Sequence, residues 1–515
     1  MASRVGVFGW GIVAPRSPTV ERFRENLQAG EHWLTPFRGF GPGNFLVGVP
    51  DFAFADYREW IGARFPPRRF AQLEEKMDLP SLYAVGAFIQ ALGQNPGLEA
   101  ALRQLGTGTH VYVGTGLGNV GKQYEASIAL DRAQRRWERF WADPARNGAL
   151  RSYLAAGTTD DGPAPDRGED ASDQRDQWNR FWAERSPELA AYLKELAAID
   201  GLAVAGAVET AKLRALRARE TQRLELQRRW GAPDPPWLVS ADVIWNIHNT
   251  PAAQVSMIGS ITGLAFAPVA ACSTFLVALR LAMAAIRSGD AKAVIVGATD
   301  PPPHPLIVGA FYSARVLSAD GRPSLPLTRF QGTHISGGSV IWVVGDYEYM
   351  TGLGFRPLGM EPLAVGVSSD AHHIITPTTD GPQAAIRQAF EVAGTGPDEI
   401  GTWDLHATAT PGDHNEVLIL QGLVPSSVLC TARKGTFGHG MSAGSGWELT
   451  AQYMGCEAGR LFPTPLGDGE LNPEIAALRT GFVTRSGDEF PPGIAGKVSI
   501  GIGGINACVL SRPWR

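Results

Sequence analysis

The sequence predicts an α/β protein in which strands and helices alternate and pack in layers. Two short apolar runs, 293–298 and 338–345, have the length and the valine and isoleucine content of buried strands. A longer apolar run up to residue 286 has the length of a buried helix. Each half of the chain repeats a similar plan, and a charged helical stretch at about 123–233 interrupts it.

The composition limits the kinds of function. The chain has 515 residues, of which 44% are hydrophobic and 19% charged, as in an ordinary soluble globular protein of roughly two to four domains. The net charge of −5 provides no broad basic field, so we expect no nucleic-acid partner. The N-terminus lacks the apolar core of a signal peptide, and there is no run of about 18 apolar residues. We therefore expect no integral membrane segment.

The four cysteines lie far apart in the sequence and none forms a Cys-x-x-Cys pair: Cys272, Cys430, Cys456 and Cys508. That spacing is typical neither of a zinc site nor of a disulfide framework. We therefore expect no metal ion and a reducing, cytoplasmic location.

The first part of the chain predicts a buried strand at 4–14, where small and apolar residues alternate. The run Gly9-Trp10-Gly11 is not a dinucleotide-binding turn, because the third glycine and the following helix are missing. The next elements are expected in this order: an amphipathic helix at 19–29, loops and short strands at 35–76, a helix at 79–92, and a strand from His110 that enters a glycine-rich loop ending at Gly118.

The interrupting stretch carries a short repeat that contains two tryptophan pairs. Trp137 and Trp141 are four residues apart, as are Trp178 and Trp182, so each pair lies on one face of a helix. We expect a helical hairpin whose tryptophans pack on each other or on the main body. A docking surface for a partner, a membrane face or a substrate lid is the alternative. Residues 157–171 predict a flexible acidic loop, and 209–229 a long polar helix.

The second part opens with Cys272, which precedes the apolar helix that Gly289 ends. A cysteine at a helix N-terminus can be an activated nucleophile, although a buried cysteine is more often a small structural hydrophobe. The later elements are expected in this order: the two strands given above, a helix at 382–394, a strand end at 403–406, a helix at 447–454, and a strand at 497–506 that enters a glycine-rich turn.

Two histidines in turns of small residues follow Cys272 in the sequence. His406 follows a strand, and His439 lies five residues after Lys434. Each histidine alone is more often a satisfied core or loop residue than a catalyst. The joint order of a cysteine before a buried helix, two such histidines and a terminal Gly-x-Gly-Gly-x-Asn run favours a catalytic site.

This order resembles the β-ketoacyl synthases, the condensing enzymes of the thiolase superfamily, over about 4–120 and 235–512. Five separated motifs carry the resemblance: Ala271-Cys272-Ser273-Thr274, the turn from His406 to Asp413, the run from Lys434 to His439, the run from Gly501 to Asn506, and the run from Asp370 to Pro377. The turn after His406 is one residue shorter than the family's pattern.

The resemblance implies a thiolase-like fold of five α/β/α/β/α layers from two related halves. The first half would take 1–122 and 234–290, the helical insertion 123–233, and the second half 291–515. It also implies an acyl carrier protein as partner, with the substrates carried on its phosphopantetheine and no bound cofactor. The chain would form a homodimer, or a heterodimer with a ketosynthase-like subunit.

The resemblance further implies a decarboxylative Claisen condensation with Cys272 as the nucleophile. His406 and His439 would be neutral hydrogen-bond donors to the enolate oxygen, and Lys434 would pair with Glu416. The backbone N–H groups of Cys272 and Ile502 would form the oxyanion hole. The remaining residues implied are Gly501, Gly503 and Asn506 in the gate, Asp413 as a support, and Thr408, Thr410, His373, Leu117, Phe275 and Ile500 at the substrate.

The chain departs from the family pattern near the predicted substrate path. Ile500 and Ile502 stand where phenylalanines are usual, and Phe275 is bulky where a small residue is common. These departures indicate an unusual acyl substrate in a specialised fatty-acid or polyketide-type pathway. Two alternatives stay open: a ketosynthase-like acyltransferase that forms an ester or amide without decarboxylation, and a non-catalytic chain-length partner subunit, against which Cys272 argues.

Overall fold

The computed structural model describes residues 3–39, 44–159, 163–165, 172–201, 209–236 and 241–514. The chain forms two compact units. Unit 1 comprises Met1–Lys122 and Asp242–Arg515, and unit 2 comprises Gln123–Ala241. The two units are described separately.

Unit 1 contains two five-stranded sheets with the same pattern of pairing. The first sheet has the order β1 (Val5–Val13), β7 (Gly338–Asp346), β6 (Ala293–Asp300), β4 (Thr109–Gly114) and β5 (Ala265–Phe266). The second has the order β8 (Met360–Ser369), β14 (Ile505–Pro513), β13 (Ile494–Gly501), β9 (Ile400–Asp404) and β10 (Leu429–Thr431). Along each of these orders the first two pairings are antiparallel and the last two are parallel. The two sheets are therefore repeats of one topology.

Both faces of the first sheet are buried along its central strands, which explains why these strands are mainly apolar. Every position of β1, β6 and β7 is buried. Along β7 the side chains alternate between two cores, so that Trp342 lies in the central core and its neighbour Ile341 in the outer one. This alternation is the period of two that the sequence-based strand assignment requires.

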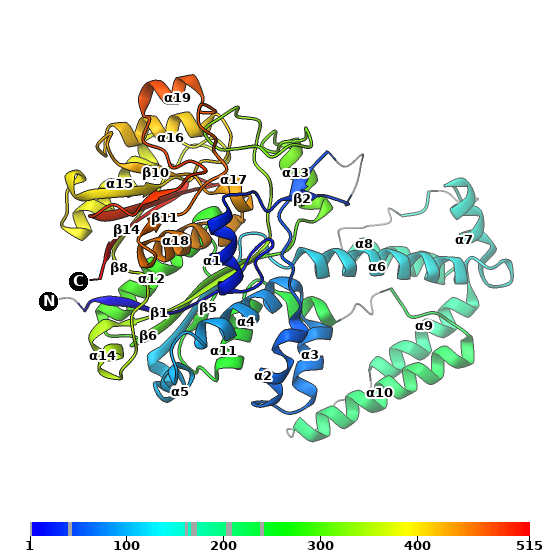
Figure 1. Cartoon of the computed structure of the whole chain (residues 1–515). Helices are drawn as coiled ribbons and strands as arrows, with labels where there is room; N and C mark the ends of the chain where they lie inside the picture. Colours follow the sequence, from blue (N-terminus) through cyan, green and yellow to red (C-terminus); the bar gives the residue numbers. More distant parts are fainter. Residues whose placement is uncertain are drawn as a thin grey trace. The chain divides into compact units, whose positions relative to one another are not determined.

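The helices complete five layers (Figure 1). Helices α12 (Thr274–Ser288) and α18 (Met441–Glu457) contribute to the central core together with residues of both sheets. Helices α4 (Leu79–Leu92) and α11 (Thr250–Gly259) cover the outer face of the first sheet. Helix α15 (Asp380–Ala393) covers that of the second. The predicted thiolase-like layering is confirmed.

The remaining helices and strands of unit 1 are short or lie at its periphery. They are α1 (Val20–Ala29), β2 (Thr35–Pro36), β3 (Leu46–Val47), α2 (Arg58–Gly62), α3 (Arg68–Lys76), α5 (Leu98–Gln104), α13 (Pro305–Ser313), α14 (Tyr347–Gly352), α16 (Gly412–Gln421), α17 (Lys434–Phe437), β11 (Arg460–Leu461), α19 (Pro473–Leu478) and β12 (Asp488–Glu489).

The predicted boundary between the halves at residue 290 is wrong. Strands β6 and β7, which the prediction placed in 291–515, complete the first sheet by pairing with β4 and β1. The second sheet begins only with β8. The error arose because β7 is an antiparallel return strand whose partner, β1, lies at the other end of the half, and sequence periodicity does not show such pairing.

Unit 2 is helical and has a core of its own. Its helices are α6 (Val120–Trp141), whose first residues belong to unit 1, α7 (Pro144–Ala156), α8 (Ser172–Ala183), α9 (Pro187–Asp200) and α10 (Glu209–Trp230). The four repeated tryptophans lie in this core, where Tyr192 contacts Trp137 and Trp141 edge-on. Within this unit the tryptophans therefore pack with one another, but among several helices rather than in a single hairpin. Much of the predicted loop at 157–171 lies outside the described residues.

One helical segment in the described part of the chain, Ala271–Ser288, is long and apolar enough to cross a membrane. It is the central α12 with the turn before it, and 61% of its residues are buried inside the protein. Its apolar character is that of a core helix between two sheets.

Candidate active site

Cys272 lies in a tight turn that leads into α12. Residues Ala271–Ser273 form a single 3₁₀ turn, and Ala271 has a positive φ of 46°, which is unusual for a residue with a side chain. Thr274 fixes the turn, since its hydroxyl accepts from the N–H of Ala270 at 2.9 Å and donates to the carbonyl of Ala271 at 2.7 Å. Ser273 Oγ donates to the carbonyl of Ile505 at 2.8 Å, which ties the turn to the second sheet.

His439 presents its Nε2 to the sulfur of Cys272 at 3.1 Å. Its other nitrogen, Nδ1, accepts from the backbone N–H of Met441 at 3.2 Å. Because Nδ1 accepts, the proton of the neutral ring is assigned to Nε2, and this N–H faces the sulfur. Gly438 before the histidine has a φ of 75°, and a Cβ there would meet Ser336 Oγ at 2.3 Å, so only glycine permits the turn.

His406 lies at the end of the second sheet, after β9. The Lys434 ammonium lies 3.4 Å from Nδ1 of His406 and also donates to the carbonyl of that residue. Since an ammonium can only donate, Nδ1 accepts and the ring proton is again on Nε2. The centres of the two imidazole rings are 5.5 Å apart with an interplanar angle of 83°. The site therefore holds two neutral N–H donors beside one thiol.

Burial and local charges determine the protonation of the site. Burial raises the pKa of the Cys272 thiol to about 11, against the opposing effects of the Lys434 charge and of the backbone N–H groups of Ile502 and Cys272. Burial, followed by the charge of Lys434, holds the pKa of His406 and His439 well below the usual range. Both imidazoles are therefore neutral near pH 7. The two backbone N–H groups that favour negative charge on the sulfur are those expected in an oxyanion hole.

The predicted pairing of Lys434 with Glu416 is wrong. The ion pair is with Glu448 of α18, whose Oε1 lies 2.7 Å from Nζ of Lys434. Glu416 instead accepts the backbone N–H groups of His406 and Ala407 at 2.6 and 2.8 Å. Burial raises the pKa of Glu416 to about 7. Glu416, ten residues after His406, therefore stabilises the turn that contains His406. The partner of Lys434 comes instead from α18, the helix that follows His439.

Asp413 holds the turn after His406 from inside. Its carboxylate accepts the N–H groups of Leu327, Thr408 and Ala409 at 2.8, 2.7 and 3.0 Å. Burial raises its pKa to about 6. The hydroxyls of Thr408 and Thr410 are 3.0 Å apart on the same turn.

The glycine-rich gate is the turn between β13 and β14. Gly503 has a φ of 89° and donates its N–H to the carbonyl of Ile374 at 2.7 Å. Asn506 donates from Nδ2 to Asp370 Oδ1 at 2.7 Å, so the gate is joined to the segment that contains His373. Ile502 is 40% exposed. In that segment His373 is exposed, and its Nδ1 accepts the N–H of Ile375 and of Thr376.

Three predicted substrate residues have different surroundings. Phe275 is fully buried in the central core, edge-on to Trp342 with ring centres 5.2 Å apart. Its side chain fills the space between α12, β7 and α18, which argues against the predicted role in selecting the substrate. Leu117 is half-buried against the cluster that includes Met441, next to His439. Ile500 packs on the outer core of the second sheet.

Four buried charged residues near the site were not predicted. Asp300, at the end of β6, accepts from the N–H groups of Leu117 and Ser442 at 2.8 and 2.7 Å and so links two loops of the site. Glu448, Asp404 and Lys497 form buried ion pairs. The sequence signal for these residues was a charged residue inside an apolar run. A charged residue is rarely fully buried unless it has a partner, so such a position indicates a buried ion pair.

The charges around the site argue against a metal ion there, although three possible ligands lie close together. Ligand atoms of Cys272, His406 and His439 lie within 4.8 Å of one another. However, the Lys434 charge that lowers the pKa of both rings opposes a cation at the same place.

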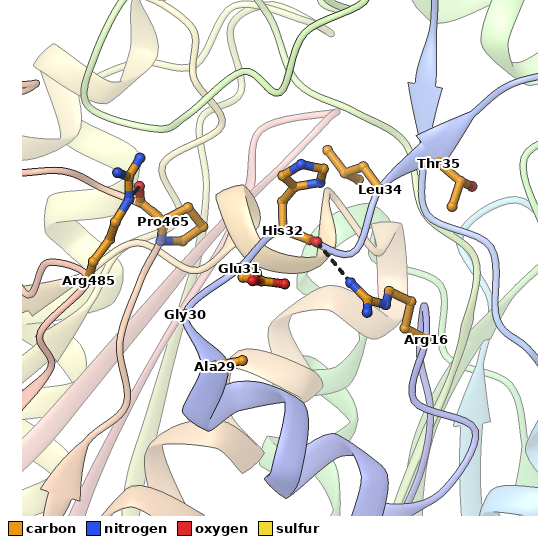
Figure 2. A pocket seen from close by; sticks show the side chains of 9 residues that line it. All are labelled: Arg16, Ala29, Gly30, Glu31, His32, Leu34, Thr35, Pro465 and Arg485. Carbon is orange, nitrogen blue, oxygen red and sulfur yellow. Dashed lines mark hydrogen bonds between the residues drawn. The ribbon is translucent and has the colours of Figure 1, made fainter.

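Figure 2 shows a surface hollow of about 500 Å³ elsewhere in unit 1. It lies between Arg16 and Arg485, and Arg16 donates to the carbonyl of His32 at its edge. None of the residues that line it belongs to the site described above, and we assign it no role.

Two family descriptions match the chain. "Beta-ketoacyl synthase, N-terminal domain" matches residues 203–345, and "Beta-ketoacyl synthase, C-terminal domain" matches residues 361–466. Nodulation protein E of Rhizobium meliloti is 30% identical over 217 residues, which cover 41% of this chain and 54% of that protein. Chloroplastic 3-oxoacyl-[acyl-carrier-protein] synthase I of Arabidopsis thaliana is 28% identical over 279 residues, which cover 52% of this chain and 58% of that protein. The chain thus spans little more than half the length of these relatives.

Solved structures share the fold over the whole chain. The ishigamide ketosynthase/chain length factor superposes with a TM-score of 0.69 at 18% identity, covering 100% of both chains. A beta-ketoacyl synthase from Burkholderia phymatum superposes with a TM-score of 0.66 at 17% identity, again covering 100% of both. The repeated five-stranded sheets and these structures show the ketosynthase fold, and the two family descriptions identify residues 203–345 and 361–466 as β-ketoacyl synthase domains.

Proposed function

We propose that the protein is a condensing enzyme that joins an acyl group to a malonyl-derived unit by decarboxylative Claisen condensation. One observation carries the proposal: the Cys272 sulfur faces Nε2 of His439 at 3.1 Å, beside a second neutral imidazole. A nucleophile alone would support acyl transfer of any kind. Two neutral N–H donors converging beside it are the arrangement that an enolate oxygen requires.

In the first step Cys272 takes the acyl group from a carrier thioester. The carbon–sulfur bond to the carrier breaks as the bond to Cys272 forms, and the thiol proton passes to the released carrier sulfur. The tetrahedral oxyanion would be bound by the backbone N–H groups of Cys272 and Ile502, which already favour negative charge on the sulfur. Because the thiol is neutral in the free enzyme, these N–H groups must act by stabilising the negative charge that develops in the transition state.

In the second step a malonyl thioester loses carbon dioxide. The electron pair of the broken carbon–carbon bond moves to the thioester oxygen, where the Nε2–H groups of His406 and His439 donate to it. The enolate carbon then attacks the acyl-cysteine, and Cys272 leaves as a thiolate and takes up a proton. Each imidazole must be neutral for its Nδ1 to accept, from Lys434 in His406 and from Met441 in His439.

The substrates and partners belong to the same proposal. Both acyl groups would arrive on the phosphopantetheine of an acyl carrier protein, with no resident cofactor. One solved relative is a type II polyketide ketosynthase in complex with its acyl-carrier protein, and two others pair a ketosynthase with a chain length factor. We infer a dimer of this kind, with a second copy or a ketosynthase-like subunit. The isoleucines at 500 and 502 and the nodulation relatives favour a specialised pathway.

The two alternative functions make different demands on the site. A chain-length partner has no use for a nucleophile, so the buried, positioned Cys272 argues against it. An acyltransferase that forms an ester or amide needs Cys272 but no pair of enolate donors. The His406 and His439 pair therefore favours condensation over both alternatives.

The test is His439→Ala, assayed for release of carbon dioxide from a malonyl carrier protein. Loss of one donor to a developing oxyanion typically lowers the rate by about 10²–10³-fold. Acylation of Cys272 by an acyl carrier protein, followed by intact mass spectrometry, should persist. The control is His32→Ala, a half-exposed histidine at the surface hollow. Undiminished decarboxylation in His439→Ala would reject condensation by this site, and acylation without any decarboxylation in the wild type would favour the acyltransferase.

A further inference from the structure

A second lysine lies fully buried behind the site, on β13. Nζ of Lys497 is 2.7 Å from Oε2 of Glu448 and 3.2 Å from Oδ1 of Asp404. It also donates to the carbonyl of Val498 at 2.7 Å. Its side chain is 0% exposed. An ammonium in such a place is costly unless each of its protons has a partner, and here four oxygen atoms lie within 3.3 Å of it, the fourth being the carbonyl oxygen of Leu405.

Lys497 links the site to a row of alternating charges. Oε1 of Glu448 binds Lys434, and Oε2 of the same carboxylate binds Lys497, so one carboxylate bridges the two lysines. On the far side of Lys497, Oδ2 of Asp404 is 3.3 Å from Nε of Arg433. The row is therefore Arg433, Asp404, Lys497, Glu448 and Lys434, and its last member contacts His406.

The row carries more positive than negative charge. Three cations alternate with two carboxylates, and the side chains in these pairs are at most 2% exposed. Other ionisable groups lie around the site: Glu416 and Asp413 from α16, which hold the turn after His406, Asp300 from the end of β6, and Cys272. Burial raises the pKa of all four, so near neutral pH they offset the row only in part.

We propose that Lys497 is a positioning residue of the active site, which holds Glu448 so that this carboxylate keeps Lys434 on His406, and which keeps both imidazoles neutral by its charge. Without the ammonium, Glu448 would have an unpaired buried oxygen and would be free to rotate away from Lys434. The charge of Lys497 is also among the causes that lower the pKa of His406 and of His439. The catalytic consequence rests on the proposed function, whereas the effect on the imidazoles does not.

The experiment compares Lys497→Met, Asp404→Asn and a control, Lys292→Met, in the full-length protein. Lys292 is a half-exposed lysine paired with Asp346 at 3.1 Å, next to the opposite end of β6 from Asp300. The first readout is the titration of His406 and His439, followed by NMR in histidine-labelled protein and assigned with His406→Ala and His439→Ala. The second is the pH profile of carbon dioxide release from a malonyl carrier protein.

We expect Lys497→Met to raise the pKa of both imidazoles by about one unit, since a nearby positive charge has been removed. The acid limb of the decarboxylation profile should move to higher pH by the same amount, with kcat at alkaline pH reduced on the order of ten-fold and KM unchanged. Asp404→Asn removes the negative charge that is paired with Lys497, so the imidazole pKa should stay at or below the wild-type value. Lys292→Met should behave as wild type.

An upward shift of the imidazole pKa in both Lys497→Met and Asp404→Asn would overturn the proposal, because general loosening of the core does not depend on the sign of the charge removed. An upward shift in neither variant would also overturn it. If Lys497→Met does not fold, the double variant Lys497→Met/Asp404→Asn, which removes one charge of each sign, is used in its place. The imidazole pKa in the double variant must then be higher than in Asp404→Asn alone. If the wild type releases no carbon dioxide, the proposed function fails while the histidine titration still decides the role of Lys497.

Discussion

At the scale of single residues, the site works with neutral groups in a buried, positively charged surrounding. Cys272 is a thiol rather than a thiolate near pH 7, and both imidazoles lack their second proton. Burial is the main cause in all three groups; the charge of Lys434 acts in the same direction on the imidazoles and in the opposite direction on the thiol. Neutral donors can stabilise an oxyanion without first losing an ion pair, which is how a preorganised site lowers a barrier.

The protonation of Cys272 predicts how its reactivity depends on pH. Since the thiolate is the nucleophile and burial raises the pKa to about 11, the rate of iodoacetamide labelling should keep rising up to about pH 11. Lys434→Met should shift this curve to higher pH, because the lysine charge lowers the pKa. Mass spectrometry of the Cys272 peptide measures the rate, with Lys292→Met as the control. A plateau reached near neutral pH would contradict the assignment.

The Cys272 thiol also contributes to the pH dependence of the free energy of unfolding, and its pKa sets the sign of that contribution. Its folded-state pKa of about 11 lies above the ordinary value of 9.0. The unfolded chain therefore loses the proton first as the pH rises, and the contribution present below pH 9 is lost progressively up to about pH 11. Cys272→Ala should remove this component from the pH dependence of the free energy of unfolding.

At the scale of elements, the two central helices position the side chains of the candidate site. Helix α12 begins beside Cys272, and α18 begins just after His439, so both N-termini meet at the site. They are held between the sheets by close packing: a Cβ on Gly446 of α18 would meet Val340 at 2.4 Å and Phe275 at 2.9 Å. The positions of Cys272 and His439 therefore depend on the fit of buried core side chains around these helices.

Phe275→Ala tests this interpretation of the helix. Deleting a fully buried phenylalanine should cost about 3–5 kcal/mol of unfolding free energy, measured by urea denaturation. The chain length of the acyl group trapped on Cys272, measured by mass spectrometry, should not change. A large change in acyl preference with little loss of stability would restore Phe275 as a selectivity residue.

At the scale of the whole molecule, the fold is one sheet topology used twice, with a separate helical unit inserted into the first half. The three large cores of unit 1 and the tryptophan core of unit 2 share no residues. The insertion begins after β4 and ends before α11, both of which belong to the first half. Each unit thus has the apolar packing that it needs to fold.

We therefore predict that replacing Gln123–Ala241 with a glycine–serine linker leaves unit 1 folded. The shortened chain should show one cooperative thermal transition and label at Cys272 at the rate of the full chain. The matched comparison is Trp182→Ala in the full chain, which should destabilise unit 2 alone and increase its hydrogen exchange. Loss of Cys272 labelling in the shortened chain, with the fold retained, would assign unit 2 a part in the site.

The sequence by itself determined the class of fold, the position of most elements and the three side chains that meet at the candidate site. Buried strands, the helix after Cys272 and the two histidine turns leave local signals, because periodicity, glycine turns and small residues are read along the chain. The tryptophan repeat likewise indicated helices with an apolar face.

Only the tertiary structure decided which residues meet across the chain. The partner of Lys434 is Glu448 and not Glu416, and β7 belongs with β1, because pairing is set by the crossing of elements that are distant in sequence. Phe275 is a core residue for the same reason, since its neighbours come from β7 and α18. The buried charge row from Arg433 to Lys434 draws on β9, β13, α18 and the start of α17, and no local pattern contains all of its members.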